Sequence, residues 1–126
     1  MNRNLEKYSI FDSRPIILIA NSSWYLYHYR KLLIKQIRKN RDYIIALCPI
    51  DSSSKKLSKL LIHIPWRMTR VKNQNIYSGL ISFLRMLFIV RAIKPKLMHS
   101  HTLQANLVAS LVSSFFGINA VFSFAG

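Results

Sequence analysis

Short apolar runs alternate with longer amphipathic or apolar segments along most of the chain, and this alternation limits the possible folds more than any other feature. The first run, Ile16 to Ala20, is rich in β-branched residues and is typical of a strand buried on both faces. Further strands are predicted at 43–48, 62–66, 96–101 and 120–124. Helices are predicted at 24–39, in a short segment ending at 61, at 76–94 and at 103–116. Strands that alternate with helices favour a parallel sheet with right-handed crossovers.

The expected fold class is therefore α/β: a Rossmann-like three-layer sandwich whose parallel sheet has the strand order 3-2-1-4-5. Pro95 is expected to stop the long helix, and Gly117 to end the next one. With 126 residues the chain has room for one domain, which we place at 15–126 after a loose N-terminal tail at 1–14. Because only Ala125 and Gly126 follow the last strand, the domain is expected to be truncated at its C-terminal end.

The charge is strongly one-sided, with 19 Lys and Arg against four acidic residues and a net charge of +15. Such a field attracts phosphate-bearing partners, namely nucleic acid, anionic lipid headgroups or diphosphate sugars, and does not choose among them. Many of these charges are equally consistent with ordinary solvated faces. Four cations of the predicted 24–39 helix are candidates for contact with an anionic membrane surface: Lys31, Lys35, Arg38 and Lys39.

The apolar segment 76–93 is barely long enough to cross a membrane, and Arg85 lies at its centre. A central Arg costs about 2.5 to 3.5 kcal/mol on insertion scales, so a buried or interfacial helix is favoured. The single cysteine, Cys48, has no internal disulfide partner, which fits a reducing compartment such as the cytosol. Its place in an apolar run predicts a core residue and not a nucleophile.

Polar residues follow the first and fourth predicted strands, where the strand order reverses and ligands usually bind. The candidate binding residues there are Asn21, Ser22, Ser23, Trp24, His101 and Thr102. Hydroxyls, imidazoles and a helix N-terminus suit sugar hydroxyls and phosphate oxygens. An alternative is that Ser22 and Ser23 only cap the following helix.

The sequence lacks the motifs that several other classes of functional site require. No G-x-G-x-x-G or Walker sequence is present, which argues against a nicotinamide enzyme and a P-loop NTPase. His99 and His101 share one face of a strand, but no third ligand lies near them in the sequence, so no metal is predicted. His99 is expected to be a core residue, and no cofactor is predicted.

Four segments resemble the N-terminal domain of GT-B glycosyltransferases of family 4, in the branch that makes capsular and lipid-linked polysaccharides. They are 16–30 (IILIANSSWYLYHYR), 46–51 (ALCPID), 95–102 (PKLMHSHT) and 106–126. The third is similar to the family segment PDIVHSHT, with Lys96 in place of the usual Asp. The last ends at Gly126, which corresponds to a glycine-containing turn of the family's active site.

This resemblance implies transfer of a sugar from a nucleotide-sugar donor to a glycan or lipid-linked acceptor, in bacterial cell-envelope polysaccharide synthesis. In such enzymes the N-terminal domain mainly supplies the acceptor site, and the C-terminal domain binds the donor. A donor domain is not found in this sequence, and the histidine that many relatives carry after the fifth strand is absent from 123–126. The expectation is a chain inactive alone, partnered by a separately encoded C-terminal domain, in the cytoplasm or peripheral to the inner face of the plasma membrane.

The alternative is a non-catalytic basic module that binds nucleic acid or an anionic membrane. Aromatic and basic residues interleave at 24–31, a mixture that can stack bases or lie at a membrane interface. The same pattern at 24–31 is also explained by a helix whose aromatic side chains pack on the sheet. A binder that relies on charge alone does not need the ordered strand–turn segments, so nucleic acid is not favoured.

Overall fold

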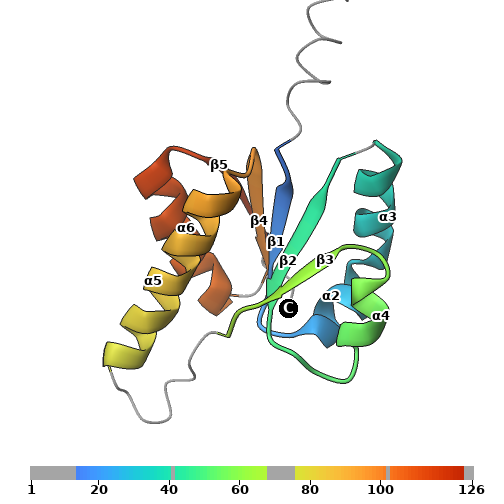
Figure 1. The fold of residues 1–126 in the computed structure, drawn as a ribbon, viewed down its shortest axis with the longest axis horizontal. Helices are drawn as coiled ribbons and strands as arrows, with labels where there is room; N and C mark the ends of the chain where they lie inside the picture. Colours follow the sequence, from blue (N-terminus) through green and yellow to red (C-terminus); the bar gives the residue numbers. More distant parts are fainter. Residues whose placement is uncertain (1–13, 41, 68–75, 102, 124–126) are drawn as a thin grey trace, which may run out of the picture.

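The computed structural model describes residues 14–40, 42–67, 76–101 and 103–123, with only the backbone at 76–79 and 103–104. Five parallel strands form one sheet in the order β3-β2-β1-β4-β5 (Figure 1), which confirms the predicted topology. The strands are β1 (Ile16–Ile19), β2 (Ile44–Cys48), β3 (Ile62–Pro65), β4 (Leu97–His101) and β5 (Asn119–Ser123). The helices are α2 (Ser23–Tyr29), α3 (Lys31–Lys39), α4 (Ser54–Ser58), α5 (Ile76–Ile93) and α6 (Leu103–Phe116).

The sheet is the middle of three layers, because successive side chains of its central strands point to opposite faces. Ile17 and Ile19 of β1 belong to the core under α5 and α6, whereas Ile16 and Leu18 belong to the core under α2, α3 and α4. Figure 1 shows α5 and α6 on one side of the sheet and the other three helices on the opposite side. All four residues of β1 are buried, as a strand covered on both faces requires.

The predicted single helix at 24–39 is wrong, because α2 ends before Arg30 and α3 begins after it. Arg30 has φ −123° and ψ 14°, outside the helical region. Leu26 and Ile34 are the buried apolar residues of the two helices and pack into the same core. On one unbroken helix, residues eight apart point about 80° away from each other. The break at Arg30 lets both residues face the sheet.

The ends of the two long helices follow the predicted stop signals. Lys94 takes a left-handed conformation (φ 53°) directly before Pro95, and Gly117 does the same (φ 66°) after α6. At the second end, the Ile118 N–H donates to the Ser113 carbonyl at 2.9 Å, which closes the helix in the manner of a Schellman motif. Lys96, which departs from the resembled family pattern, forms an ion pair with Asp42.

We expect Leu18→Ala to lower the free energy of unfolding by about 2 to 5 kcal/mol, because it opens a cavity in a fully buried part of the sheet. The matched control is Leu32→Ala on α3, whose side chain is 83% exposed. That control is expected to change stability by no more than about 0.5 kcal/mol. Urea unfolding followed by circular dichroism measures both, and equal losses in the two variants would contradict the described core.

Candidate functional site at the carboxyl edge of the sheet

The residues predicted to bind a ligand leave the sheet at one edge. Ile19 of β1 lies opposite Leu47 of β2 and Ser100 of β4, so these three strands end at the same level. The turn at 21–24 and the end of β4 at His101 therefore flank the point where the strand order reverses. Two further predicted site residues, Thr102 and Gly126, lie outside the described residues.

The turn after β1 is fastened to the loop after β2 through Ser23. The buried Ser23 hydroxyl donates to the Pro49 carbonyl at 2.6 Å and accepts from the Ser54 hydroxyl at 3.0 Å. It also lies 3.2 Å from the Cys48 sulfur. Such bonds hold two strand ends together, so this hydroxyl performs a structural task inside the protein. A ligand-binding role for Ser23 stays a prediction.

The other residues of the turn are more accessible. Asn21 is exposed, and the half-buried Ser22 caps α2 by accepting from the Tyr25 N–H at 3.0 Å. The Trp24 N–H donates to a carboxylate oxygen of Asp51 at 3.0 Å. This carboxylate therefore takes the place beside the first turn of α2 that the sequence analysis suggested for a ligand phosphate. The Trp24 indole stays on the surface and stacks on His28 at 4.6 Å between ring centroids.

A second network joins the α2–α3 junction to β4 and β5. Arg30 Nε donates to His101 Nδ1 at 3.2 Å, and the Arg30 guanidinium lies 5.5 Å from the centre of the Tyr25 ring. The rings of His99 and His101 are 4.2 Å apart between centroids. His99 Nε2 lies 2.8 Å from the Ser123 hydroxyl, within hydrogen-bonding distance. His101 is fully buried, whereas His99, which the sequence analysis expected to be a core residue, is only half-buried.

The electrostatics of this network keep His101 neutral. Burial, followed by the neighbouring His99 and Arg30, lowers the pKa of His101 to about 3. The pKa of His99 is lowered by burial and then by Arg30. A guanidinium only donates hydrogen bonds, so His101 Nδ1 is the acceptor and its proton sits on Nε2. His101 thus offers a neutral N–H donor and not a cationic one.

That donor is one of several buried polar atoms near the end of β4 that lack a partner. Among the described residues, His101 Nε2, Ser100 Oγ, Asn106 Oδ1 and Tyr25 Oη make no hydrogen bond. The other amide atom of Asn106, Nδ2, donates to the Ser123 carbonyl at 3.1 Å and so holds α6 against β5. A buried polar atom without a partner costs about 1 to 3 kcal/mol. Donors and acceptors of this kind are suited to the hydroxyl groups of an uncharged polar ligand.

A hollow of about 190 Å³ opens near the ends of β2 and β3. Its lining residues are Pro49, Ile50, Pro65, Trp66, Arg67 and Arg85. The two arginines are exposed beside apolar side chains, which suits an anionic group attached to an apolar one. Sequence reasoning missed this hollow because its walls come from three segments far apart in the chain.

The four cations predicted to contact a membrane lie on α3. Lys35, Arg38 and Lys39 are exposed, whereas Lys31 is half-buried with its ammonium group 3.2 Å from the Tyr27 hydroxyl. Within the described ranges, no helix is both long enough and apolar enough to span a bilayer. The membrane role of these cations stays a prediction. No group of three or more His, Cys, Asp or Glu side chains suited to a metal ion occurs in the described part of the chain.

Comparison with known proteins identifies the fold class. No family model and no curated protein sequence matches the chain. Among solved structures, MurG of Acinetobacter baumannii, a GT-B glycosyltransferase, matches with a TM-score of 0.68 at 11% identity. The match covers 90% of this chain and 36% of MurG, so the chain spans about a third of that enzyme.

A second similar structure is the C-terminal domain of a hydrogenase from Pyrococcus furiosus. It matches with a TM-score of 0.60 at 14% identity, over 89% of this chain and 93% of that domain. The chain therefore has a Rossmann-like α/β fold of the kind found in GT-B glycosyltransferases. Identities this low show the fold alone, since one fold hosts many functions.

Stability should depend on pH through His101. Its folded pKa, about 3, lies below the usual value of 6.5, so the unfolded chain binds the extra proton first. The contribution of neutral His101 is fully present above about pH 6.5 and is lost as the pH falls toward 3. Within that window the free energy of unfolding should fall by up to about 1.4 kcal/mol per pH unit. Urea unfolding at several pH values measures the slope. The slope should flatten in His101→Gln and persist in His28→Gln; an equal slope in all three proteins would contradict the assignment.

Cys48 should be unreactive in the folded protein. Burial raises the pKa of its thiol to about 12, against the smaller effect of the hydrogen bond between Cys48 and Ser23, so the reactive thiolate is scarce near neutral pH. A thiol-specific reagent at about pH 8 should label Cys48 slowly in buffer and rapidly in denaturant. Ser23→Ala is expected to leave the folded protein protected, since burial is the larger cause. Rapid labelling of the folded wild-type chain would contradict the described core.

Proposed function

We propose that this chain is the acceptor-side half of a two-domain glycosyltransferase related to GT-B family 4, in the capsular and lipid-linked polysaccharide branch. The observation that carries the proposal is the cluster of unpartnered buried polar atoms around His101, at the reversal point of the sheet. Ligands of open α/β sheets bind at this edge. A fold similar to about a third of MurG supports the same reading.

The proposed site binds the acceptor through hydroxyl groups. His101 Nε2–H donates to an acceptor hydroxyl, and Asn106 Oδ1 accepts from a neighbouring one. Asn21, Ser22 and the exposed Trp24 border the site on the β1 side, and Ser23 holds that border to the β2 loop. Arg30 is a positioning residue, because its bond to Nδ1 fixes the tautomer of His101. Thr102 and Gly126 remain in the proposal as residues that follow β4 and β5.

The nucleotide-sugar donor is assigned to a C-terminal domain that faces this edge. Residues 15–126 then form one wall of the cleft, and a separately encoded C-terminal glycosyltransferase domain is the proposed partner. Transfer requires that donor and acceptor be held together, an effect worth roughly 7 to 11 kcal/mol. One wall of a cleft does not hold both reactants. The proposed location is the cytoplasmic face of the plasma membrane, where lipid-linked acceptors are accessible.

The 126-residue chain is expected to show no sugar transfer and no donor hydrolysis alone, and to gain transfer when mixed with a C-terminal domain of the same class. A panel of nucleotide sugars with glycan and lipid-linked acceptors, followed by product chromatography, measures both conditions. Turnover by the chain alone would falsify the half-enzyme assignment. Absence of transfer in every mixture would count against the glycosyltransferase assignment itself.

In an active mixture, His101→Gln should lower kcat/KM by about tenfold, the effect of one lost hydrogen bond to substrate. Gln36→Ala is the control, because Gln36 is exposed on α3, whereas His28 stacks on Trp24 at the border of the proposed site. That control should change kcat/KM by less than about twofold. Circular dichroism establishes that each variant is folded before the comparison. Equal effects of the two substitutions would remove His101 from the site.

A further inference from the structure

The outer faces of α5 and α6 carry large apolar side chains that the core does not use. Phe88 of α5 is 73% exposed and Phe115 of α6 is 72% exposed. Further large apolar side chains exposed on the described parts of these helices are Leu80, Ile81, Leu84, Leu107 and Leu111. Surface apolar residues gathered in this way mark sites of interaction with a protein or a membrane.

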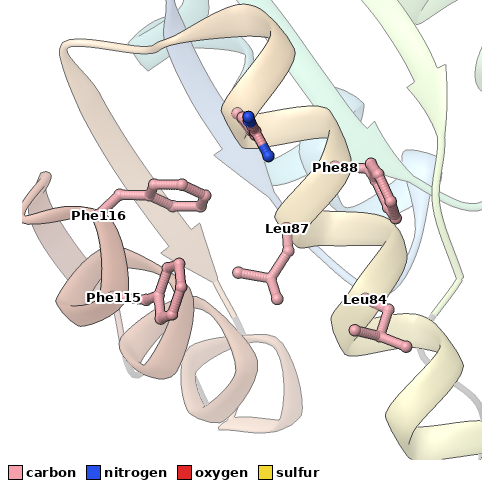
Figure 2. A pocket seen from close by; sticks show the side chains of 6 residues that line it. Leu84, Leu87, Phe88, Phe115 and Phe116 are labelled. Atoms are coloured by element: carbon pink, nitrogen blue, oxygen red, sulfur yellow. The ribbon is translucent and has the colours of Figure 1, made fainter.

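A groove of about 410 Å³ runs between the two helices; we call it the α5–α6 groove. It is lined by Leu84, Leu87, Phe88, Arg91, Phe115 and Phe116. Figure 2 shows Leu87 of α5 and Phe115 of α6 pointing toward one another across it. Arg91 is the only charged side chain among the described residues of the lining. The groove is thus an apolar channel with a cation at its border.

Helical spacing explains why this face is separate from the core. Leu107, Leu111 and Phe115 recur every four residues and form one stripe along α6, while Val108 and Val112 face the sheet. On α5, Leu84 and Phe88 form the corresponding outer pair. Both helices therefore bury one apolar face in the protein and present a second one outward. Packing within the described residues accounts for the first face only.

The charges around this face point to a negative occupant. Arg85 and Arg91 are exposed on α5, and neither α5 nor α6 contains an acidic residue. The described acidic side chains are engaged elsewhere, Asp42 with Lys96 and Asp51 with the Trp24 N–H. A second copy of the chain would bring the same arginines together, with a net charge of +15 on each molecule. The occupant should combine an apolar interior with a negative surface.

We propose that the α5–α6 groove is the docking face for a bilayer of anionic phospholipid. The two helices lie in the plane of the interface, with Phe88 and Phe115 at the boundary of the acyl chains. Arg85 and Arg91 extend their guanidinium groups toward the lipid phosphates. The cations of α3 lie on the other side of the sheet, so one flat surface does not contact both helical layers (Figure 1). The proposal is therefore an alternative to the predicted membrane role of the α3 cations. This proposal does not depend on sugar transfer, and its test contains no transferase readout.

The experiment measures sedimentation of the full chain with vesicles of phosphatidylcholine alone and of phosphatidylcholine mixed with phosphatidylglycerol. Binding is expected only to the mixed vesicles and should weaken with salt. Phe88→Ser/Phe115→Ser and Arg85→Gln/Arg91→Gln should each reduce binding at least about tenfold. The matched control Lys35→Gln/Arg38→Gln removes two charges from α3 and should reduce it less than about twofold. A loss in the α3 control with none in the α5 variants would overturn the proposal, as would equal binding to both vesicle types.

A second measurement uses a probe at a surface position, which avoids any effect on the core. Since Cys48 is buried, Phe88→Cys and Leu32→Cys can be labelled selectively with an environment-sensitive fluorophore. Emission of the label at position 88 should shift to the blue with mixed vesicles, and emission at position 32 should not. A shift at position 32 alone would assign the membrane face to α3. Concentration-dependent dimerisation that Phe88→Ser/Phe115→Ser removes, without vesicle binding, would assign the groove to a second copy.

Discussion

The burial of β1 on both faces is the constraint on which the rest of the structure depends. Ile16 to Ile19 are covered by helices above and below and paired with β2 and β4 at their sides. Because none of its four side chains is exposed, β1 determines how its neighbours pair with it. A shift of its pairing by one residue would move every side chain of β1 to the opposite face of the sheet. The reversal of strand order beside β1 then places the candidate site between its end and the end of β4.

The carboxyl edge divides into two parts with different physical properties. On the β2 side, Ser23, Asp51 and Ser54 satisfy one another and fasten α2 to the sheet. On the β4 side, His101 and Asn106 keep polar atoms without a partner. The first part gives rigidity, and the second keeps hydrogen-bonding groups that the described part of the protein does not use. A His101 with a pKa of about 3 is suited to positioning a substrate by donating a hydrogen bond and not to carrying a proton near neutral pH.

The two helical layers differ in the chemistry of the surfaces that they present to solvent. The layer of α2, α3 and α4 presents mainly cations to solvent, together with the separate apolar side chains of Trp24, Tyr29 and Leu32. The layer of α5 and α6 buries one apolar face and exposes another, which Arg91 borders, and Arg85 is also exposed on α5. In the proposed arrangement α5 borders both the membrane face and the hollow near β2 and β3, because Arg85 of α5 lines that hollow. A lipid-linked acceptor would then reach the edge from the surface that holds it.

The sequence by itself determined the fold class, the strand order and the helix stops at Pro95 and Gly117, because these follow from local periodicity, backbone preference and chain connectivity. It also placed 21–24 and His101 at one edge. The tertiary structure alone decided the break at Arg30 and its bond to His101, 71 residues away. It likewise decided the internal use of the Ser23 hydroxyl and the exposure of the outer faces of α5 and α6. Side-chain partners and solvent access depend on which distant segments come into contact. The periodicity of a single segment does not contain this information.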